Sequence, residues 1–178
     1  MVFTENLRTM TLREVIKLPN PVLRRKAHKV TDFGGEFQTL IEDMIETMRN
    51  EPGVGLAAPQ VGISQRLIVV EYPEDDSIEN AAPKLFIVAN PEFKEMSEES
   101  VKGIEGCLSV PGLLGQVERS LEVKVTGLDR RGKKQTIKAK GWLARIFQHE
   151  VDHLNGILFV DRALELYQPE EVQATEKV

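Results

Sequence analysis

The sequence predicts one globular domain that contains both helices and strands, with at least one antiparallel pair of strands. Its 178 residues include 41% hydrophobic and 29% charged residues, a balance typical of a soluble chain with a single core. Apolar residues repeat at helical spacing in two segments, 37–48 and 141–154. Short β-branched runs lie between these segments, and a tight turn joins two of the expected strands, which makes that pair antiparallel.

The domain is expected over residues 16–165, between an N-terminal extension of residues 1–15 and a short C-terminal tail of residues 166–178. Ile16–Leu18 is expected to open the first strand. Asn20 and Pro21 then predict the N-cap and the first residue of a short helical turn, because asparagine accepts from free N–H groups and proline fits a first turn.

The first long helix is predicted to begin at a cap on Thr31 or Asp32 and to end at Asn50, before Pro52 and Gly53. One of its faces is apolar, which predicts that it is buried in the core. This face consists of Phe37, Leu40, Ile41, Met44, Ile45 and Met48.

A run of glycines and small residues follows over residues 53–62, and such a backbone can approach a ligand closely. No Lys-Ser/Thr pair follows the glycines, which argues against a phosphate-binding loop. Gln60 ends the run of small residues. Its amide suits the stabilisation of an oxyanion, although a turn residue facing water fits the local sequence equally well.

Four strands are predicted in the middle of the chain. Two β-branched runs are joined by an acidic loop that is expected to be solvated, and the second run is expected to stop at Asn90-Pro91. A third strand alternates apolar and polar residues and turns at Asp129–Gly132 into a fourth. The predicted strands are Arg66–Glu71, Leu85–Ala89, Val117–Val125 and Lys133–Lys138.

The last long helix is predicted from Gly141 to Leu154, with Gly156 as its stop, and it contains the sequence His-Glu-Val-Asp-His. His149 and His153 lie four residues apart, so they share one helix face and can bind one metal ion. Glu150 can then take a proton from a water that the metal activates.

The helix is mostly apolar and is expected to be buried. Two histidines on such a helix are hard to explain as packing, since each buried imidazole needs a partner. A polar stripe of Arg145, Gln148 and Asp152 provides candidates for hydrogen bonds to the ligands or for an ion pair, with plain surface as the alternative.

A catalytic centre of this type needs a third ligand. His28 is the only other histidine, but it lies in a charged stretch that is expected to be solvated surface. Cys107 is the better candidate because glycines flank its segment, Glu105–Gly112, although a lone cysteine is more often a small buried hydrophobe. A single cysteine also excludes an intramolecular disulfide and suits a reducing compartment.

Three segments together resemble the peptide deformylase family. They are Gly53–Gln60 (GVGLAAPQ), Glu105–Ser109 (EGCLS) and Gln148–Gly156 (QHEVDHLNG), in the family's order and with similar separations. Pro19–Ala27 and Gly141–Arg145 are also similar, so the resemblance extends over about residues 16 to 162.

The resemblance implies a single domain of the α+β class, with antiparallel strands packed around a central buried metal-binding helix. It also implies a hydrolase that removes the formyl group from N-terminal formylmethionine of new polypeptides. It implies Fe²⁺ as cofactor, with Zn²⁺, Ni²⁺ or Co²⁺ as alternatives in a purified sample. By the same resemblance, Cys107, His149 and His153 would bind the metal and Glu150 would act as general base and acid. Gln60 and the Leu108 N–H would bind the oxyanion, and Val54, Gly55 and Leu56 would pair with the substrate main chain. Trp142 and Ile146 would line a methionine pocket, with Glu105 nearby.

The partners implied are formyl-methionyl peptides and nascent chains, in a bacterial-type cytoplasm. The acidic tail from Glu165 onward does not support ribosome docking through a basic C-terminal helix. No apolar run is long enough for a membrane span, and a net charge of −5 argues weakly against nucleic acid as the main ligand.

Two alternatives remain at this point. A zinc peptidase would need a downstream third ligand, for which Glu165 and Asp161 are the nearby carboxylates. A non-catalytic binding module would keep the pocket without turnover.

Overall fold

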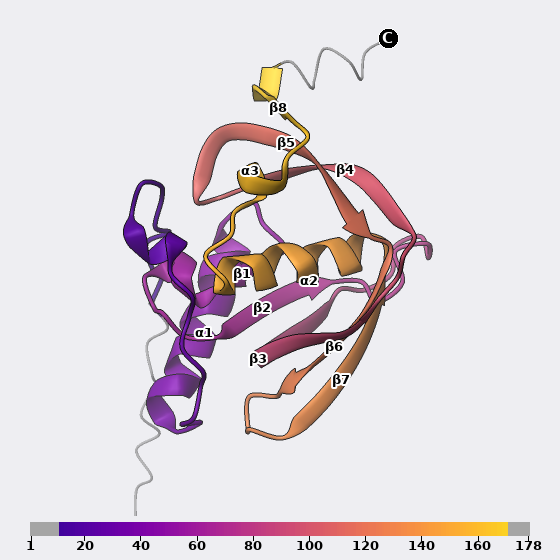
Figure 1. The fold of residues 1–178 in the computed structure, drawn as a ribbon. Helices are drawn as coiled ribbons and strands as arrows, with labels where there is room; N and C mark the ends of the chain where they lie inside the picture. Colours follow the sequence, from indigo (N-terminus) through magenta and orange to yellow (C-terminus); the bar gives the residue numbers. More distant parts are fainter. Residues whose placement is uncertain (1–10, 171–178) are drawn as a thin grey trace, which may run out of the picture.

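The computed structural model describes residues 11–170, and the first ten and last eight residues of the chain lie outside this description. Two antiparallel sheets form the body of the molecule (Figure 1). The larger sheet has the order β1-β2-β3-β6-β7 and the smaller has the order β4-β5-β8. The strands are β1 Gly55–Ala57, β2 Leu67–Tyr72, β3 Lys84–Met96, β4 Ser100–Cys107, β5 Val110–Ser120, β6 Glu122–Leu128, β7 Lys134–Lys140 and β8 Glu165–Tyr167.

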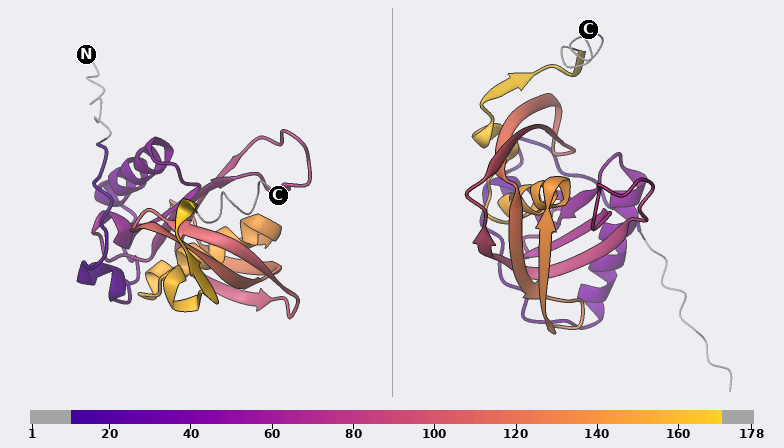
Figure 2. Two further views of the ribbon diagram at one scale, coloured as in Figure 1. Left: turned by 90° about the horizontal axis from the view of Figure 1, so that it is seen from above. Right: turned by 90° about the vertical axis from the view of Figure 1, so that its right-hand side faces the viewer.

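Two long helices lie on opposite faces of the larger sheet (Figures 1 and 2). They are α1, Gly35–Asn50, and α2, Gly141–Leu154, and three shorter helical segments are η1 Pro21–Arg24, η2 Ala58–Val61 and α3 Phe159–Arg162. Strand β2 separates the two cores: Ile68 and Val70 pack with α2, whereas Leu67 and Val69 pack with α1. This division follows from the two-residue period of a strand, and it explains why β2 is apolar on both faces.

The α+β class, the antiparallel strands and the buried helix α2 are confirmed. Helix α2 has the predicted bounds, and Gly156 follows it with φ of 73°. The turn at Asp129–Gly132 joins β6 and β7 as an antiparallel hairpin, as predicted. Asn20 caps η1 by accepting a hydrogen bond from the Val22 N–H at 3.0 Å.

Four details of the sequence prediction are wrong. Ile16–Leu18 is not a strand, although it is tied by backbone hydrogen bonds to Gln60 and Ser109. Helix α1 is capped at Gly34, because the Asp32 side chain instead accepts from the Gly34 N–H in the turn before it.

Strand β3 does not stop at Asn90. This residue adopts a positive φ of 51°, and the register shifts there, so the strand bulges and continues to Met96. The segment Val117–Val125 is not one strand but the end of β5 and the start of β6. Leu121 lies between them and donates its N–H to Glu99, where the chain passes from the smaller sheet to the larger.

Both ends of α2 are held by distant side chains. The Trp142 N–H donates to Asp76 at 3.4 Å, so the acidic loop before β3 reaches the start of this helix. At the other end, the buried Arg66 donates to the Leu154 carbonyl at 3.2 Å and to the Asn155 side chain at 3.0 Å. A carboxylate at the N-terminus and a cation at the C-terminus both suit the helix dipole.

The predicted division into extension, domain and tail remains a prediction. Most of residues 1–15 and 166–178 lie outside the description, and strand β8 spans the predicted boundary after residue 165. Within residues 11–170, no helix is long and apolar enough to cross a membrane.

Candidate metal centre

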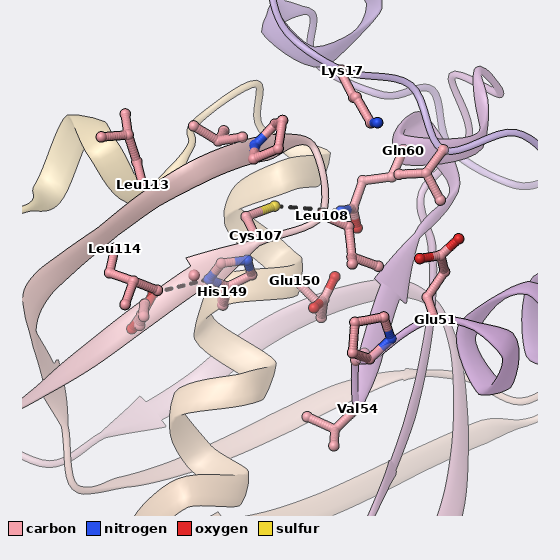
Figure 3. Close-up of a pocket in the computed structure, with 18 of the residues that line it drawn as sticks. Lys17, Glu51, Val54, Gln60, Cys107, Leu108, Leu113, Leu114, His149 and Glu150 are labelled. Carbon is pink, nitrogen blue, oxygen red and sulfur yellow. Dashed lines mark hydrogen bonds and ion pairs between the residues drawn. The ribbon is translucent and has the colours of Figure 1, made fainter. Parts of the chain in front are cut away.

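Cys107, His149 and His153 come together in the structure. One ligand atom from each lies within 4.8 Å of the others, and Cys107 Sγ is 3.2 Å from His153 Nε2. The two rings lie one turn apart on α2, with centroids separated by 5.0 Å. Figure 3 shows the Cys107 sulfur and the His149 ring facing the same space. His28 is not part of the group found among the described residues, and its backbone forms an isolated bridge to Gln65.

Cys107 is the last residue of β4 and stands at a hairpin corner. Leu108 and Ser109 form the turn, Cys107 pairs with Val110, and the register shifts between Gly106 and Cys107. This corner directs the thiol toward α2. Glu105 precedes Cys107 by two residues, so both side chains leave the strand on the same face.

Glu105 orients the first histidine. Its Oε2 lies 2.9 Å from His149 Nδ1, which leaves His149 Nε2 free to face the thiol and the pocket. Histidine ligands of metals usually donate the other ring N–H to a carboxylate, a backbone carbonyl or a water, and Glu105 fills this position here. The carboxylate of Glu105 is itself fully engaged by protein groups, so a direct contact with substrate stays a prediction for this residue.

A buried network of charges surrounds Glu105. Arg119 donates to both of its oxygens at 2.9 Å and to Asp152 at 2.6 Å, while Arg145 donates to its Oε1 at 2.8 Å. Asp152 also accepts from Arg162 at 2.6 Å. Burial acts to raise the pKa of Glu105, but its hydrogen bonds with His149 and Arg119 outweigh burial and hold this pKa well below its usual range. Arg145 and Asp152 are therefore not surface residues.

Arg119 was missed by the sequence reasoning. A signal for it exists in the alternation of Val117, Leu121, Val123 and Val125, because Arg119 falls on the same apolar face. An arginine at an inward-facing position needs a buried anionic partner. Gln148, the third member of the predicted polar stripe, holds the backbone of Ser120 through a pair of hydrogen bonds.

Glu150 lies beside the ligand group and points from α2 toward β1 (Figure 3). Its side chain is buried, and its Oε2 has no hydrogen-bond partner among the described residues. Burial raises the pKa of this carboxyl to about 7. Gly55 makes room for it, because a Cβ at this position would lie 2.5 Å from Glu150 Oε1.

The two histidines differ in their electrostatic surroundings. Burial opposes the charged form of His149, but its contacts with Cys107 and Glu105 outweigh burial and raise its pKa to about 10. Burial, reinforced by the nearby His149, lowers the pKa of His153 well below its ordinary value. Imidazole binds cations in its neutral form, so a metal ion at this site competes with the proton on His149.

Gln60 is buried in the site and does not face water. Its Oε1 accepts from the Ala57 N–H at 2.9 Å, and this bond fixes the orientation of the amide. Its Nε2 then lies 3.5 Å from Cys107 Sγ and 3.3 Å from Ser109 Oγ. The amide N–H groups are thus directed at the space beside the thiol.

A cavity of about 1050 Å³ opens over this group. Ten of the predicted site residues line it: Val54, Gly55, Gln60, Glu105, Cys107, Leu108, Trp142, Ile146, His149 and Glu150. Leu56 does not line it, because its side chain is buried in the core beside α1, and His153 lies beneath the cavity. The cavity is also lined by residues that the sequence reasoning did not single out: Lys17, Glu51, Ile104, Leu113 and Leu114.

The donor set fits a divalent transition metal. One thiol and two imidazoles supply three ligands, the orphaned Glu150 oxygen lies beside them, and the cavity leaves room for a further ligand. Asp161, a ligand in the alternative peptidase, is instead paired with Arg24 at 2.5 Å. The fold and the site together define a metal-dependent hydrolase.

Comparison with known proteins gives the family. The polypeptide deformylase family model matches residues 12–168. A peptide deformylase of Symbiobacterium thermophilum is 52% identical over 157 residues, covering 88% of this chain and 69% of the relative. The peptide deformylase of Natranaerobius thermophilus is 44% identical and covers 91% of this chain and 99% of the relative.

Solved structures of peptide deformylases are also similar to this chain. A Met-Ala-Ser-bound class I type b peptide deformylase of Acinetobacter baumannii has a TM-score of 0.79 and 42% identity, covering 86% of this chain and 99% of that chain. The Thermotoga maritima peptide deformylase has a TM-score of 0.78 and 42% identity, and the match covers 87% of this chain and 99% of that chain. The chain therefore belongs to the peptide deformylase family, metal-dependent hydrolases that remove the N-formyl group from nascent peptides.

Proposed function

We propose that this deformylase acts on N-terminal formylmethionine and that Glu150 moves the proton in the reaction. The observation that supports the assignment is the buried Glu150 Oε2, which has no hydrogen-bond partner within residues 11–170 and lies beside the Cys107, His149 and His153 group. A buried polar atom without a partner costs free energy, so such an atom in an enzyme site indicates a missing ligand.

Each protein group has one task in the proposed reaction. A divalent ion bound at this group supplies Lewis acidity, which makes water nucleophilic at neutral pH. Glu150 accepts a proton as water attacks the formyl carbon, and the same carboxyl returns the proton to the departing amine nitrogen. Glu105 keeps the His149 ring in one tautomer throughout.

Two donors stabilise the oxygen that becomes negative at the formyl carbon. They are the Gln60 Nε2 group and the backbone N–H of Leu108. The bond from the Ala57 N–H to Gln60 Oε1 supports this role, because it fixes which end of the amide faces the thiol. Donors fixed in advance lower the barrier without reorganising during the reaction.

The substrate main chain is proposed to add to β1 as a further strand. β1 stands at the edge of the larger sheet, so one side of Val54, Gly55 and Leu56 has no strand partner among the described residues. Pairing of this kind recognises the backbone of a peptide and tolerates many sequences. A relative bound to Met-Ala-Ser supports a peptide that begins with methionine.

Trp142 and Ile146 are proposed as walls of the methionine pocket. They precede His149 by about two turns and one turn of α2, and both line the cavity. Their stacking along one helix face sets the distance between the first side chain of the substrate and the metal ligands.

We propose Fe²⁺ as the native ion, with Zn²⁺, Ni²⁺ or Co²⁺ as possible occupants of a purified sample. A thiolate and two imidazoles suit each of these ions, so the choice depends on the family resemblance. Purification without oxygen followed by metal analysis tests it. A sample that contains zinc alone, even when purified anaerobically from iron-supplied cells, would contradict the assignment.

The proposed substrates include nascent chains, which places the enzyme in the cytoplasm where ribosomes produce them. Transient contact with the ribosome is not supported by the acidic end of the chain. The extension and tail boundaries at residues 15 and 165 remain part of this proposal.

Release of formate from formyl-Met-Ala-Ser, measured anaerobically, tests the reaction. The Glu150→Gln variant should lose at least about 100-fold in kcat and keep its affinity for the peptide. Glu122→Gln, an exposed glutamate on β6, is the matched control and should keep wild-type kcat. A wild-type enzyme that binds the peptide but releases no formate would instead indicate a binding module.

A further inference from the structure

Arg145 is a buried cation that the proposed reaction does not use. Only 3% of it is exposed, and it lies on α2 between Trp142, one turn before it, and His149, one turn after it. A buried arginine is retained only where hydrogen bonds and opposite charge offset its desolvation. Its contacts therefore indicate what it holds in place.

One side of the guanidinium holds the support of the metal ligand. Nη1 donates to Glu105 Oε1 at 2.8 Å, and the other oxygen of that carboxylate bonds His149. The remaining donors reach backbone carbonyls, Val117 at 2.8 Å and Val101 at 2.6 Å. The planar fork is thereby fixed against both β4 and β5, which a single-point ammonium cannot reproduce.

The other side of the guanidinium faces the cavity wall. Its Cζ lies 5.4 Å from the centroid of the Trp142 ring, within the range of a cation–π contact. Trp142 is 40% exposed and lines the cavity, and the Arg145 guanidinium is one of the contacts that hold its ring in place. Arg145 is the cation that the structure places over it.

Gly103 provides the space that this arrangement needs. A Cβ on Gly103 would lie 2.8 Å from Arg145 Cζ and 2.9 Å from Nη2. A methyl group at this position would therefore displace the guanidinium without changing its chemistry. β4 thus passes close to Arg145 because this residue is a glycine.

We propose that Arg145 is a positioning residue that couples recognition of the first substrate side chain to the hold on the metal ligands. One guanidinium sets the Trp142 wall on one side and the Glu105 carboxylate behind His149 on the other. The selectivity part of this inference rests on the proposed role of Trp142 in the methionine pocket. The positional part concerns the ring and the carboxylate and is tested separately.

Trp142 is the only tryptophan in the chain, so its fluorescence reports directly on the wall. The Arg145→Met variant should shift the emission of the folded, metal-loaded protein and speed its quenching by acrylamide. Removing the cation–π contact should also reduce the selectivity for formyl-Met-Ala-Ser over formyl-Ala-Ala-Ser by about two- to tenfold in kcat/KM. Retention of Ni²⁺ against a chelator should fall by about tenfold, since Glu105 loses one of its two arginines.

Gly103→Ala is the second variant and keeps the arginine itself. It should reproduce the direction of all three changes, and it guards against a failure of Arg145→Met to fold. In a Trp142→Leu background, Arg145→Met should change the selectivity no further. Equal effects of Arg145→Met in both backgrounds would overturn the coupling to Trp142.

Arg66→Met is the matched control, because Arg66 is a buried arginine that holds the opposite end of α2. It should lower the stability of the protein and leave the Trp142 emission and the selectivity unchanged. The proposal is overturned if Arg66→Met changes them as much as Arg145→Met does, or if both Arg145→Met and Gly103→Ala fold with wild-type emission, selectivity and metal retention.

Failure of the proposed function can be distinguished from failure of the Arg145 proposal. It would appear as a wild-type enzyme without formate release from formyl-Met-Ala-Ser, whatever the Arg145 variants do. The emission and Ni²⁺ measurements need no turnover, so they still decide whether Arg145 positions the ring and the carboxylate.

Discussion

Substitution of Gly55 by alanine tests the position of Glu150 most directly. An added Cβ would lie 2.5 Å from Glu150 Oε1, 2.9 Å from Cδ and 3.0 Å from Cγ. Ordinary contact begins at 3.4 Å, so the carboxylate must retreat by about 0.9 Å. All three close atoms belong to one side chain, which means that Glu150 absorbs the clash.

A displacement of this size should lower kcat by about 100-fold, which corresponds to about 2.7 kcal/mol of transition-state free energy, because proton transfer depends on geometry within an ångström. The assay is anaerobic formate release from formyl-Met-Ala-Ser, with metal content measured on the same sample. Crowding should also destabilise the fold by about 1–3 kcal/mol, measured by urea unfolding.

Gly53→Ala is the matched control, because Gly53 lies two residues before Gly55, in the segment that leads into β1. Its Cβ would lie 3.5 Å from Leu108 Cδ1, an ordinary contact, so kcat should stay close to the wild-type value. In the Glu150→Gln background, Gly55→Ala should cost little more, because both changes remove the same function. A fully metallated Gly55→Ala enzyme with kcat within about threefold of wild type would refute this assignment of Glu150.

Three further predictions follow from the same structure. Cys107→Ala should abolish tight metal binding, because two imidazoles alone leave the site one ligand short; full metal occupancy after dialysis, measured by elemental analysis, would contradict this. Arg119→Met should destabilise the fold by about 3–5 kcal/mol in urea unfolding, since it leaves Glu105 with one arginine, and a loss below about 1 kcal/mol would show that the network relaxes. The hydrogen bond from Arg49 lowers the pKa of Glu71 below 4.5, so this pair stabilises the fold above that pH and the contribution is lost as the pH falls through the lowered value. Because Arg49 is half exposed, the stability that is lost between pH 7 and pH 3 should be smaller in Glu71→Gln than in wild type by about 0.2–1 kcal/mol, measured by unfolding at both pH values. An equal loss in the two proteins would refute the pairing.

The spacing of residues in the sequence was sufficient to predict one part of the site. His149, Glu150 and His153 follow from helical periodicity, because their relative positions depend on contacts within one turn. The small residues of the 53–62 run likewise indicate a close approach, and the structure shows that Gly55 approaches the Glu150 side chain. Long, strongly periodic elements such as α1 and α2 were predictable for the same reason.

The places where the chain leaves a regular element were not predictable in this way. At Asn90 a polar residue that usually ends a strand instead forms a bulge, because its side chain finds the backbone of Val30 as a partner at 2.8 Å. Around Leu121 the alternation of apolar and polar residues continues without a break, so the sequence gives no sign that the chain passes here from the smaller sheet to the larger. Both outcomes depend on neighbours that are distant in the sequence.

The chain alone thus established which residue types are available for metal hydrolysis and how two of the ligands are spaced. The meeting of Cys107 with His153, 46 residues away, was decided by the packing of the β4–β5 hairpin against α2. The same packing turned Arg119 and Arg145 inward around Glu105. Periodicity within an element reports on neighbours one turn away, whereas a contact between a strand corner and a helix depends on how two separate surfaces pack together.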